Sequence, residues 1–404
     1  MSGKKFRVAS LFSGCGGLDL GFVGGFKHRH FDFPQTGFKI VFANDFDSDA
    51  GRVYQANQKY LGDHSFNPGD VTKIPTDEIP SFDVLLAGFP CQPFSNAGNR
   101  QGISDKDGRG TLFYECERII KHCSKNSKGE LPKAFVFENV RGILSSKMSD
   151  GKTVPEEIAF KMSKLGYKVT TKLLKTSDFG VPQNRFRVII VGVRKDIKEF
   201  DFKEMDEVVR KFNLPSLQSD HYELTLGSIL SDIPKNAPHH DDYWKYSGSG
   251  QRMVDLIGPC EDGVEALAKF KRKAPLDKIS TTITQGRSWK NIPLELLTPR
   301  FRKIHDDPKK YHAPNFYRRF ALGEIAGTIT ASAQPENCGI THPFENRRMT
   351  LREIARIQTF PDDFVFPYTS IAGAYKVIGN AVPPVFGWVI ANALKSHLEK
   401  HAPK

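Results

Sequence analysis

A single cysteine, Cys91, follows an apolar run at a position where it could act as a nucleophile. Residues 82–87 read Phe-Asp-Val-Leu-Leu-Ala, which is typical of a buried strand, and the Pro-Cys-Gln-Pro that follows cannot continue that strand. A residue at the end of a strand in an open α/β sheet faces the crevice in which ligands bind. A thiolate there could attack an electrophilic carbon. A buried structural cysteine explains the same segment equally well.

Four further motifs accompany the cysteine segment in a fixed order along the chain. Residues 12–17 read Phe-Ser-Gly-Cys-Gly-Gly, and residues 137–140 read Phe-Glu-Asn-Val. Residues 183–187 read Gln-Asn-Arg-Phe-Arg, and residues 379–382 read Gly-Asn-Ala-Val. With these motifs in this order, the chain resembles the DNA cytosine-5 methyltransferases of bacterial restriction–modification systems. Each motif alone is a weak signal, whereas the ordered set is specific.

The resemblance implies methyl transfer from S-adenosylmethionine, with S-adenosylhomocysteine as product, to carbon 5 of a cytosine flipped out of double-stranded DNA. Carbon 5 is a poor nucleophile. Addition of the Cys91 thiolate to carbon 6 would turn the ring into an enamine that can attack the sulfonium methyl. Glu138 fits the residue that protonates ring nitrogen 3, provided that burial raises its pKa enough to hold a proton near neutrality; a capping or salt-bridge carboxylate is the alternative.

The resemblance also assigns roles to the two arginines of the third motif. Arg185 would hold the base and steady the nucleophile, and Arg187 would orient Glu138. Phosphate contact or a solvated position is the alternative for both arginines. No residue stands out as the base that removes the carbon 5 proton, and water can serve.

The glycine-rich turn at residues 13–17 follows an expected strand and precedes an expected helix, so its amides can approach a ligand. It is not Gly-x-Gly-x-x-Gly, which disfavours a dinucleotide; a tight structural turn is the alternative. By the resemblance, Asp45 would accept hydrogen bonds from the ribose hydroxyls and Phe46 would lie under the adenine. The shorter Asp stands where the family usually has Glu, and Asp47 is the alternative acid. The full set of expected cofactor residues is Phe12, Gly14, Gly16, Gly17, Asp45, Phe46, Asp70, Pro90, Asn380 and Val382.

Two regions are expected to contact DNA. The loop 95–110 is polar and glycine-rich, and it resembles a mobile lid over the flipped base. Sequence choice should come from loops that combine donors with aromatic surface, near residues 287–290 and 300–303. The expected DNA-binding residues are Ser95, Arg100, Arg109, Arg287 and Arg300.

Composition agrees with a polyanionic partner. The 404 residues carry a net charge of +12, and the pI is about 9.3. The six cysteines form no Cys-x-x-Cys pair, so we expect neither a metal site nor a disulfide framework, in keeping with a reducing bacterial cytoplasm. No signal peptide and no membrane-spanning run are expected.

The order of apolar and amphipathic segments predicts an α/β fold, a doubly wound and mostly parallel sheet of the S-adenosylmethionine-dependent methyltransferase type. Residues 1–195 and 346–404 should form the catalytic and cofactor-binding domain, interrupted by a smaller, irregular target-recognition domain at 196–345. Within the insert, residues 247–250 read as loop. Thr350 should cap a helix, with Glu353 completing a capping box. The expected strands are 6–12, 38–43, 82–88, 134–138, 168–174 and 186–193.

The favoured function is a DNA methyltransferase that acts as a monomer. We expect it to pair functionally with a restriction endonuclease, without a stable complex. Three other functions compete with this one. A tRNA cytosine methyltransferase on the same scaffold typically has a Cys-Phe-Thr signature, whereas residues 357–361 here read Ile-Gln-Thr-Phe-Pro. An inactive DNA-binding module would lack Cys91, Glu138 or the glycine turn. A nicotinamide oxidoreductase would need the missing Gly-x-Gly-x-x-Gly.

Overall fold

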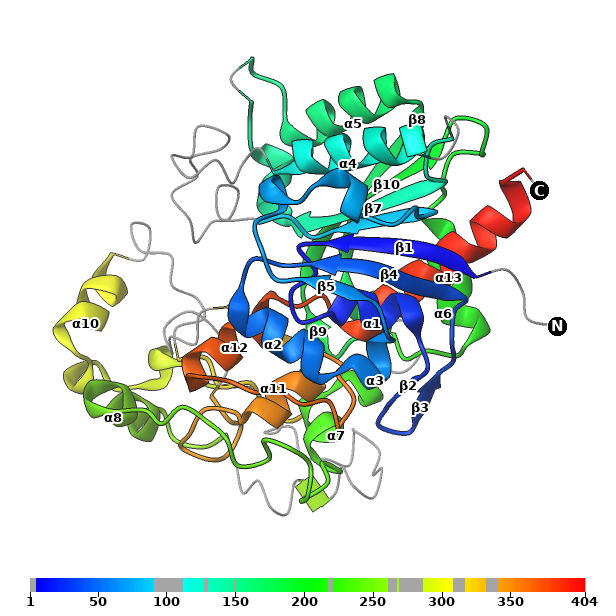
Figure 1. Cartoon of the computed structure of the whole chain (residues 1–404). Coiled ribbons are helices and arrows are strands. Elements are labelled where there is room, and N and C mark those ends of the chain that lie inside the picture. Colours follow the sequence, from blue (N-terminus) through cyan, green and yellow to red (C-terminus); the bar gives the residue numbers. More distant parts are fainter. Residues whose placement is uncertain are drawn as a thin grey trace.

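A seven-stranded sheet forms the centre of the protein (Figure 1). The computed structural model describes residues 5–90, 112–126, 130–148, 150–216, 221–260, 267–268, 286–307, 317–331 and 341–403. The strand order is β5-β4-β1-β6-β7-β10-β8. Neighbours from β5 to β7 are parallel, and β10 runs antiparallel to both β7 and β8. The strands are β1 (Phe6–Leu11), β4 (Phe38–Asn44), β5 (Ser65–Asn67), β6 (Val84–Ala87), β7 (Ala134–Val140), β8 (Tyr167–Lys175) and β10 (Phe186–Arg194).

All six strands expected from the apolar runs are present, each within two residues of its expected ends. The predicted fold class, a mostly parallel sheet with helices on both faces, is confirmed. The short edge strand β5 was not expected. Neither was the hairpin of β2 (Phe26–His28) and β3 (Phe31–Phe33).

Alternate side chains of the strands enter two different hydrophobic clusters. In β7, Ala134 and Val136 belong to one cluster, whereas Phe135 and Phe137 belong to the other. This period of two residues is what a strand buried on both faces requires. Helices α1 (Gly17–Val23), α6 (Lys203–Lys211) and α13 (Pro384–His401) cover the first face, and α4 (Phe113–Asn126) and α5 (Val154–Leu165) cover the second (Figure 1).

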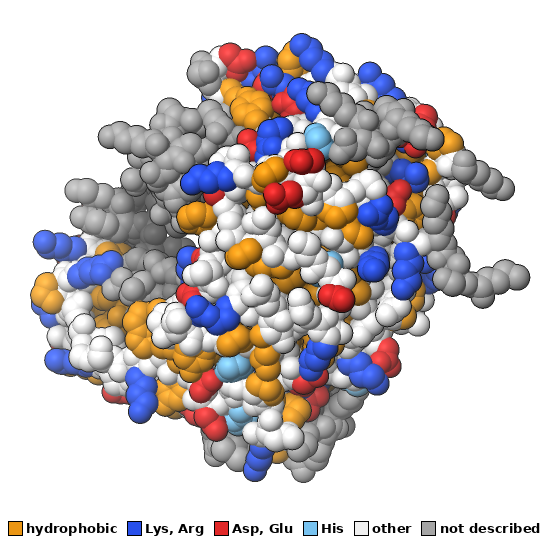
Figure 2. Space-filling view, in the orientation of Figure 1, with side chains coloured by type: hydrophobic (Ala, Val, Ile, Leu, Met, Phe, Trp, Pro, Cys, Tyr) orange, Lys and Arg blue, Asp and Glu red, His pale blue; other side chains and the backbone are white. Residues whose placement is uncertain are grey.

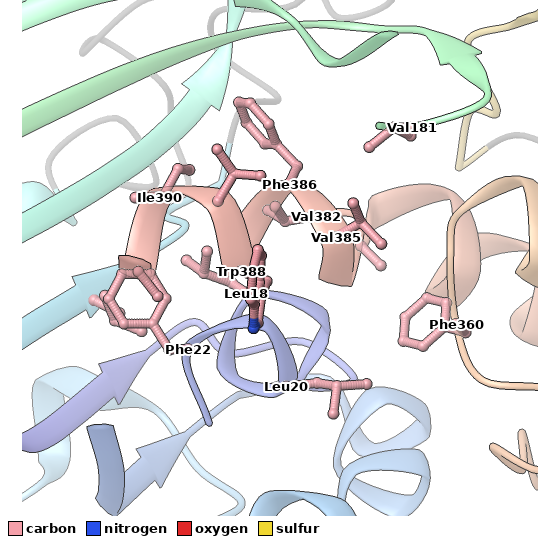
Figure 3. Packing of buried hydrophobic residues seen from close by; sticks show 14 of the residues in the cluster. Leu18, Leu20, Phe22, Val181, Phe360, Val382, Val385, Phe386, Trp388 and Ile390 are labelled. Atoms are coloured by element: carbon pink, nitrogen blue, oxygen red, sulfur yellow. The ribbon is translucent and has the colours of Figure 1, made fainter. Parts of the chain in front are cut away.

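The last helix joins the far end of the chain to its beginning. Figure 3 shows Trp388 and Phe386 of α13 among buried residues that include Leu18 and Phe22 of α1. Residues 371–401 are long and apolar enough to cross a membrane by length and composition, contrary to the expectation from the sequence. Within the protein, 89% of the most apolar 18-residue stretch of this span is buried, which is typical of a core helix.

The chain returns to the sheet through two further helices, α11 (Leu351–Ile357) and α12 (Ile371–Asn380). The predicted cap of α11 is confirmed. The Thr350 hydroxyl accepts a hydrogen bond from the Glu353 amide at 3.2 Å, and the Glu353 carboxylate accepts one from the Thr350 amide at 2.7 Å. Helices α2 (Ser48–Ala56), α3 (Gln58–Leu61) and α7 (Leu226–Leu230) complete the arrangement around the sheet.

A separate hydrophobic cluster lies in the inserted region, around α8 (Gly248–Ile257) and α10 (Pro299–Asp306). We call this part the recognition lobe; its buried residues run from Tyr246 to Tyr317. Helix α8 begins at Gly248, so the prediction of a loop over 247–250 is wrong. Residues between 197 and 229 belong instead to the cluster of the sheet: Ile197, Phe200, Phe202, Met205, Val208, Leu214, Leu226 and Ile229.

Candidate active site

Four parallel strands end at one edge of the sheet and bring the expected site residues to one level. Leu11 of β1 pairs with Asn44 of β4 and with Ala87 of β6, and Ala87 pairs with Phe137 of β7. The carboxyl ends of parallel strands form the crevice in which such sheets bind ligands. The residues that directly follow are Phe12, Asp45, Gly88 and Glu138.

The turn after β1 has an unusual backbone. Phe12 has a φ of +54°, a left-handed conformation that costs a non-glycine residue about 1–2 kcal/mol. Gly14 has a φ of +57°, and a Cβ atom there would meet nothing within 4 Å. At Gly17 a Cβ atom would lie 2.3 Å from the carbonyl oxygen of Val382. The turn therefore needs Gly17 for packing, whereas Gly14 borders open space.

Asp45 is tied to this turn through its carboxylate. Oδ2 accepts a hydrogen bond from the Gly14 amide at 2.7 Å, and Oδ1 accepts one from the Asp47 amide at 2.8 Å. Burial raises the pKa of Asp45, and these amide hydrogen bonds oppose the rise. Each oxygen keeps a further lone pair, so the carboxylate can still accept from a ligand hydroxyl.

Phe46, the next residue, exposes 79% of its surface at the same edge. Asp47 caps α2 by accepting from the amides of Asp49 and Ala50, and its Oδ2 accepts from Lys376 Nζ at 2.6 Å. Partial burial acts to raise the pKa of Asp47, but the Lys376 and amide hydrogen bonds outweigh it and lower this pKa. Phe46 thus offers a free ring face, whereas Asp47 is engaged in its helix cap and ion pair.

Asp70 is placed by the side chain of Asn44. Asn44 Nδ2 donates to the carbonyl oxygens of Asn67 at 3.0 Å and Gly69 at 2.7 Å, which holds the segment before Asp70 against β4. Asp70 itself accepts from the hydroxyl and amide of Thr72, and these hydrogen bonds lower its pKa.

Glu138 and Arg187 form an ion pair between adjacent strands. Nε of Arg187 lies 2.5 Å from Oε1 of Glu138, and each side chain is 11% exposed. The Nε–H bond does not point along this contact, so the pair is held by charge more than by a hydrogen bond. Glu138 Oε2 lies 3.7 Å from the position that a Cβ atom of Gly88 would occupy. The carboxylate therefore lies beside Gly88, the residue that follows β6 and stands three residues before Cys91.

The segment that leads to the cysteine is anchored by a residue for which the sequence predicted no role. Asn139 Nδ2 donates to the carbonyl oxygen of Phe89 at 3.2 Å, and both residues are buried. Pro90 is half-buried and is the last described residue before the gap. Four residues for which the sequence predicted a role as nucleophile or in the lid lie outside the described residues: Cys91, Ser95, Arg100 and Arg109.

Arg185 lies in the interior, 1% exposed. Its Nη1 donates to the carbonyl oxygen of Ile329 at 2.7 Å, and its Nη2 donates to that of Gly379 at 2.9 Å. Beside it, Gln183 Nε2 donates to Gln358 Oε1 at 2.8 Å, and Gln183 Oε1 accepts from the Ile329 amide at 2.9 Å. The arginine motif therefore divides into a buried half that holds other chain segments and Arg187 at the carboxylate.

The terminal motif reaches the glycine turn from the other end of the chain. Val382 is buried, with its carbonyl against Gly17, and Asn380 is exposed at the end of α12. Val382 therefore packs against the glycine turn, and Asn380 lies two residues before it in the chain.

Arg287 and Arg300, two of the expected DNA-binding residues, are both exposed in the recognition lobe. Arg287 Nη1 donates to the carbonyl oxygens of Ile257 and Pro259, each at 3.1 Å, so part of its guanidinium supports the lobe. Lys and Arg side chains lie along the outer surface of this lobe in Figure 2.

Two of the cysteines in the described residues, Cys15 and Cys116, are poor nucleophiles. Burial raises the pKa of Cys15 to about 12, and it also raises the pKa of Cys116 on α4. Neither thiol is exposed. Within the described residues there is no group of three or more His, Cys, Asp or Glu that could hold a metal ion.

Comparison with known proteins covers nearly the whole chain. The family model of the C-5 cytosine-specific DNA methylases matches residues 6–396. A Type II methyltransferase of Fusobacterium nucleatum, M.FnuDI, is 31% identical over 97% of this chain and 95% of its own. M.NgoFVII of Neisseria gonorrhoeae is 34% identical over 95% of this chain and 84% of its own. The S. pombe Dnmt2 methyltransferase structure aligns with a TM-score of 0.56 at 16% identity, over 98% of this chain and 99% of that one.

Proposed function

Because the chain belongs to the C-5 cytosine-specific DNA methylases, we propose that it methylates carbon 5 of a flipped-out cytosine within one specific double-stranded DNA sequence. It is an enzyme, a DNA (cytosine-5) methyltransferase of the Type II restriction–modification class. The observation that carries the proposal is the Glu138–Arg187 ion pair, which lies beside the end of β6 at the same sheet edge as the Gly14–Asp45 turn.

The proposed methyl donor is S-adenosylmethionine, which supplies an electrophilic methyl group when bound. Three features of the edge fit it. Gly14 leaves open space, Asp45 keeps acceptor capacity for ribose hydroxyls, and Phe46 presents a free ring for the adenine. Asp70, Asn380 and Val382 would close the pocket around them.

In the proposed reaction the Cys91 thiolate adds to carbon 6 of the cytosine, and Glu138 delivers a proton to ring nitrogen 3. Arg187 holds the Glu138 carboxyl in place through the 2.5 Å contact. Asn139 fixes the backbone at Phe89 and so sets the direction in which the chain enters Cys91. After methylation, the carbon 5 proton leaves to water and the ring nitrogen 3 proton returns to Glu138, so that the Cys91–carbon 6 bond breaks and the thiolate is restored.

Target choice is proposed to reside in the recognition lobe, and the lid at 95–110 would cover the flipped base. We propose a monomer that acts on DNA in a bacterial cytoplasm and protects it from a partner endonuclease without a stable complex between the two. The net charge of +12 supports DNA as the partner.

The direct test is methylation of DNA in vitro with labelled S-adenosylmethionine, followed by sequencing that locates 5-methylcytosine. The wild-type protein should modify one cytosine in one short sequence, and Cys91→Ser should not, because a serine hydroxyl is far less ionised than a thiol. DNA with 5-fluorocytosine at the target should trap a covalent complex through Cys91, since fluorine blocks the final elimination.

Cys116→Ala is the matched control, because that thiol is buried on α4. It should methylate and form the trapped complex as the wild type does. An adduct on another cysteine would overturn the role of Cys91. Modification of tRNA in place of DNA would overturn the proposed substrate.

A further inference from the structure

The buried half of the arginine motif lies at a meeting point of three distant chain segments. Strand β9 (Gln183–Asn184) pairs in parallel with β11 (Ala326–Gly327), and the Thr328 hydroxyl donates to the carbonyl of Asn184 at 2.9 Å. Residues 317–329 connect this point to the recognition lobe, since Tyr317 belongs to the lobe's cluster and Ile329 to that of the sheet. We call the contacts among 183–185, 326–330 and 378–379 the seam.

Two side-chain groups hold the seam together. Arg185 bridges the carbonyls of Ile329 and Gly379, and Gln183 accepts from the Ile329 amide while donating to Gln358. Gln358 in turn donates to the carbonyl of Ile378 at 2.7 Å, and it is fully buried. Both terminal nitrogens of this buried guanidinium donate to main-chain carbonyls, so the Arg185 side chain is held within the seam.

The seam is directly connected to the proposed chemistry. Arg187, two residues beyond Arg185, contacts Glu138, and Asn380 follows Gly379. A Cβ atom on Gly379 would lie 2.2 Å from the carbonyl oxygen of Thr330, so the two segments are in tight contact. Movement of segment 326–330 would therefore displace both the segment that contains Arg185 and the end of α12.

We propose that Arg185 is a positioning residue that couples the recognition lobe to the Glu138–Arg187 pair, so that correct docking of the lobe on DNA aligns the catalytic edge. This rests on the proposed function. In contrast to the role that the family resemblance suggests for it, Arg185 does not contact the base. It sets the geometry of residues that do.

Variants at two partner residues in the seam, and at Arg185 itself, test this proposal. Gln358→Met removes the Gln183 and Ile378 hydrogen bonds at nearly constant volume, Thr328→Val removes the bond to Asn184, and Arg185→Lys shortens the bridge. The measurement is the ratio of kcat/KM on the cognate sequence to that on sequences with one base pair changed. Melting temperature and S-adenosylmethionine affinity are measured alongside it.

All three variants should lower cognate kcat/KM and the discrimination ratio together, by about three- to thirtyfold, the range expected for lost coupling. Tyr167→Phe is the matched control: it removes a buried hydrogen bond to the Pro132 carbonyl, far from the seam, and should keep the ratio. If Arg185→Lys abolishes transfer while Gln358→Met and Thr328→Val match Tyr167→Phe, Arg185 acts at the base and the proposal is wrong. Wild-type protein that methylates no DNA would instead refute the proposed function.

Discussion

The amide of Gly14 donates a 2.7 Å hydrogen bond to the carboxylate of Asp45, across 31 residues of sequence and between neighbouring strands. This bond fixes the glycine turn relative to the end of β4. The acid proposed to bind the ribose therefore also shapes the backbone that cradles the same ligand.

Asp45→Ala should weaken S-adenosylmethionine binding by roughly 1.5–3 kcal/mol, because a charged acceptor is lost and two amides lose their partner. Apparent DNA affinity should change little. Isothermal titration calorimetry on the purified protein measures the first quantity, and gel-shift titration the second. Asp47→Ala is the control, since it costs only the cap of α2 and the Lys376 contact. Loss of cofactor affinity in Asp47→Ala alone would move the ribose acid to that position.

Gly14→Ala should lower S-adenosylmethionine affinity at least about tenfold, because the new methyl group would enter the open space assigned to the cofactor. Gly62→Ala is the matched control for Gly14→Ala. Gly62 has a φ of +88° and also has nothing within 4 Å of its Cβ position, but it lies after α3. Both variants bear backbone strain of about 1–3 kcal/mol. Equal cofactor affinity in the two variants would show that Gly14 does not border the binding site.

The sequence predicted the parallel sheet and the approximate ends of its strands because runs such as 84–87 are apolar throughout, as strands buried on both faces are. It also predicted the cap at Thr350, because a capping box is encoded within four residues. Glu138 and Arg187 were singled out by their motifs, and the antiparallel pairing of β7 and β10 explains how they meet.

Other features depend on contacts that no local pattern encodes. Gln183 and Gln358 are 175 residues apart, and neither carries a signal that it bonds to the other. Arg185 and Arg187 are the same residue type within one motif. They differ in how deeply each side chain is buried, which the sequence does not indicate. The start of α8 in Ser-Gly-Ser-Gly was missed because packing of Met253, Val254 and Ile257 in the lobe outweighs low helix propensity.

Stability should fall as the pH rises through the titration of Asp19. This residue of α1 is fully buried, accepts hydrogen bonds from Ser10 at 2.6 Å and Tyr54 at 2.7 Å, and has its pKa raised by burial from 3.8 to about 6. The folded state favours the neutral form of Asp19. The stabilisation that results is fully present below pH 3.8 and is lost as the pH passes about 6. The loss amounts to about 3 kcal/mol in the free energy of unfolding.

Asp19→Asn should remove this pH-dependent contribution to stability. The difference in free energy of unfolding between wild type and variant should therefore change between pH 4 and pH 7. Urea unfolding at a series of pH values measures it. Asp70→Asn is the control of opposite sign: the pKa of Asp70 is lowered by its Thr72 hydrogen bonds, so its contribution is lost as the pH falls. A wild-type-to-Asp19→Asn difference that is constant with pH would mean that the pKa of Asp19 is the same in the folded and unfolded states.

Exchange of the recognition lobe should transfer target choice. A chimaera that takes residues 246–317 from a relative with another target replaces the lobe's own cluster and keeps Trp244 and Phe320, which pack against the sheet's cluster. Exchange of 196–345 should fold less well, because Ile197, Phe200 and Met205 pack in the cluster that includes α13. The smaller chimaera should therefore be active and methylate the donor's sequence, as read by sequencing of modified DNA. An active chimaera that still modifies the original sequence would place recognition in the large domain.

Within the lobe, Arg300→Ala should cost about 1–3 kcal/mol at one position of the site if Arg300 reads a base, and should weaken all sequences alike if it contacts phosphate.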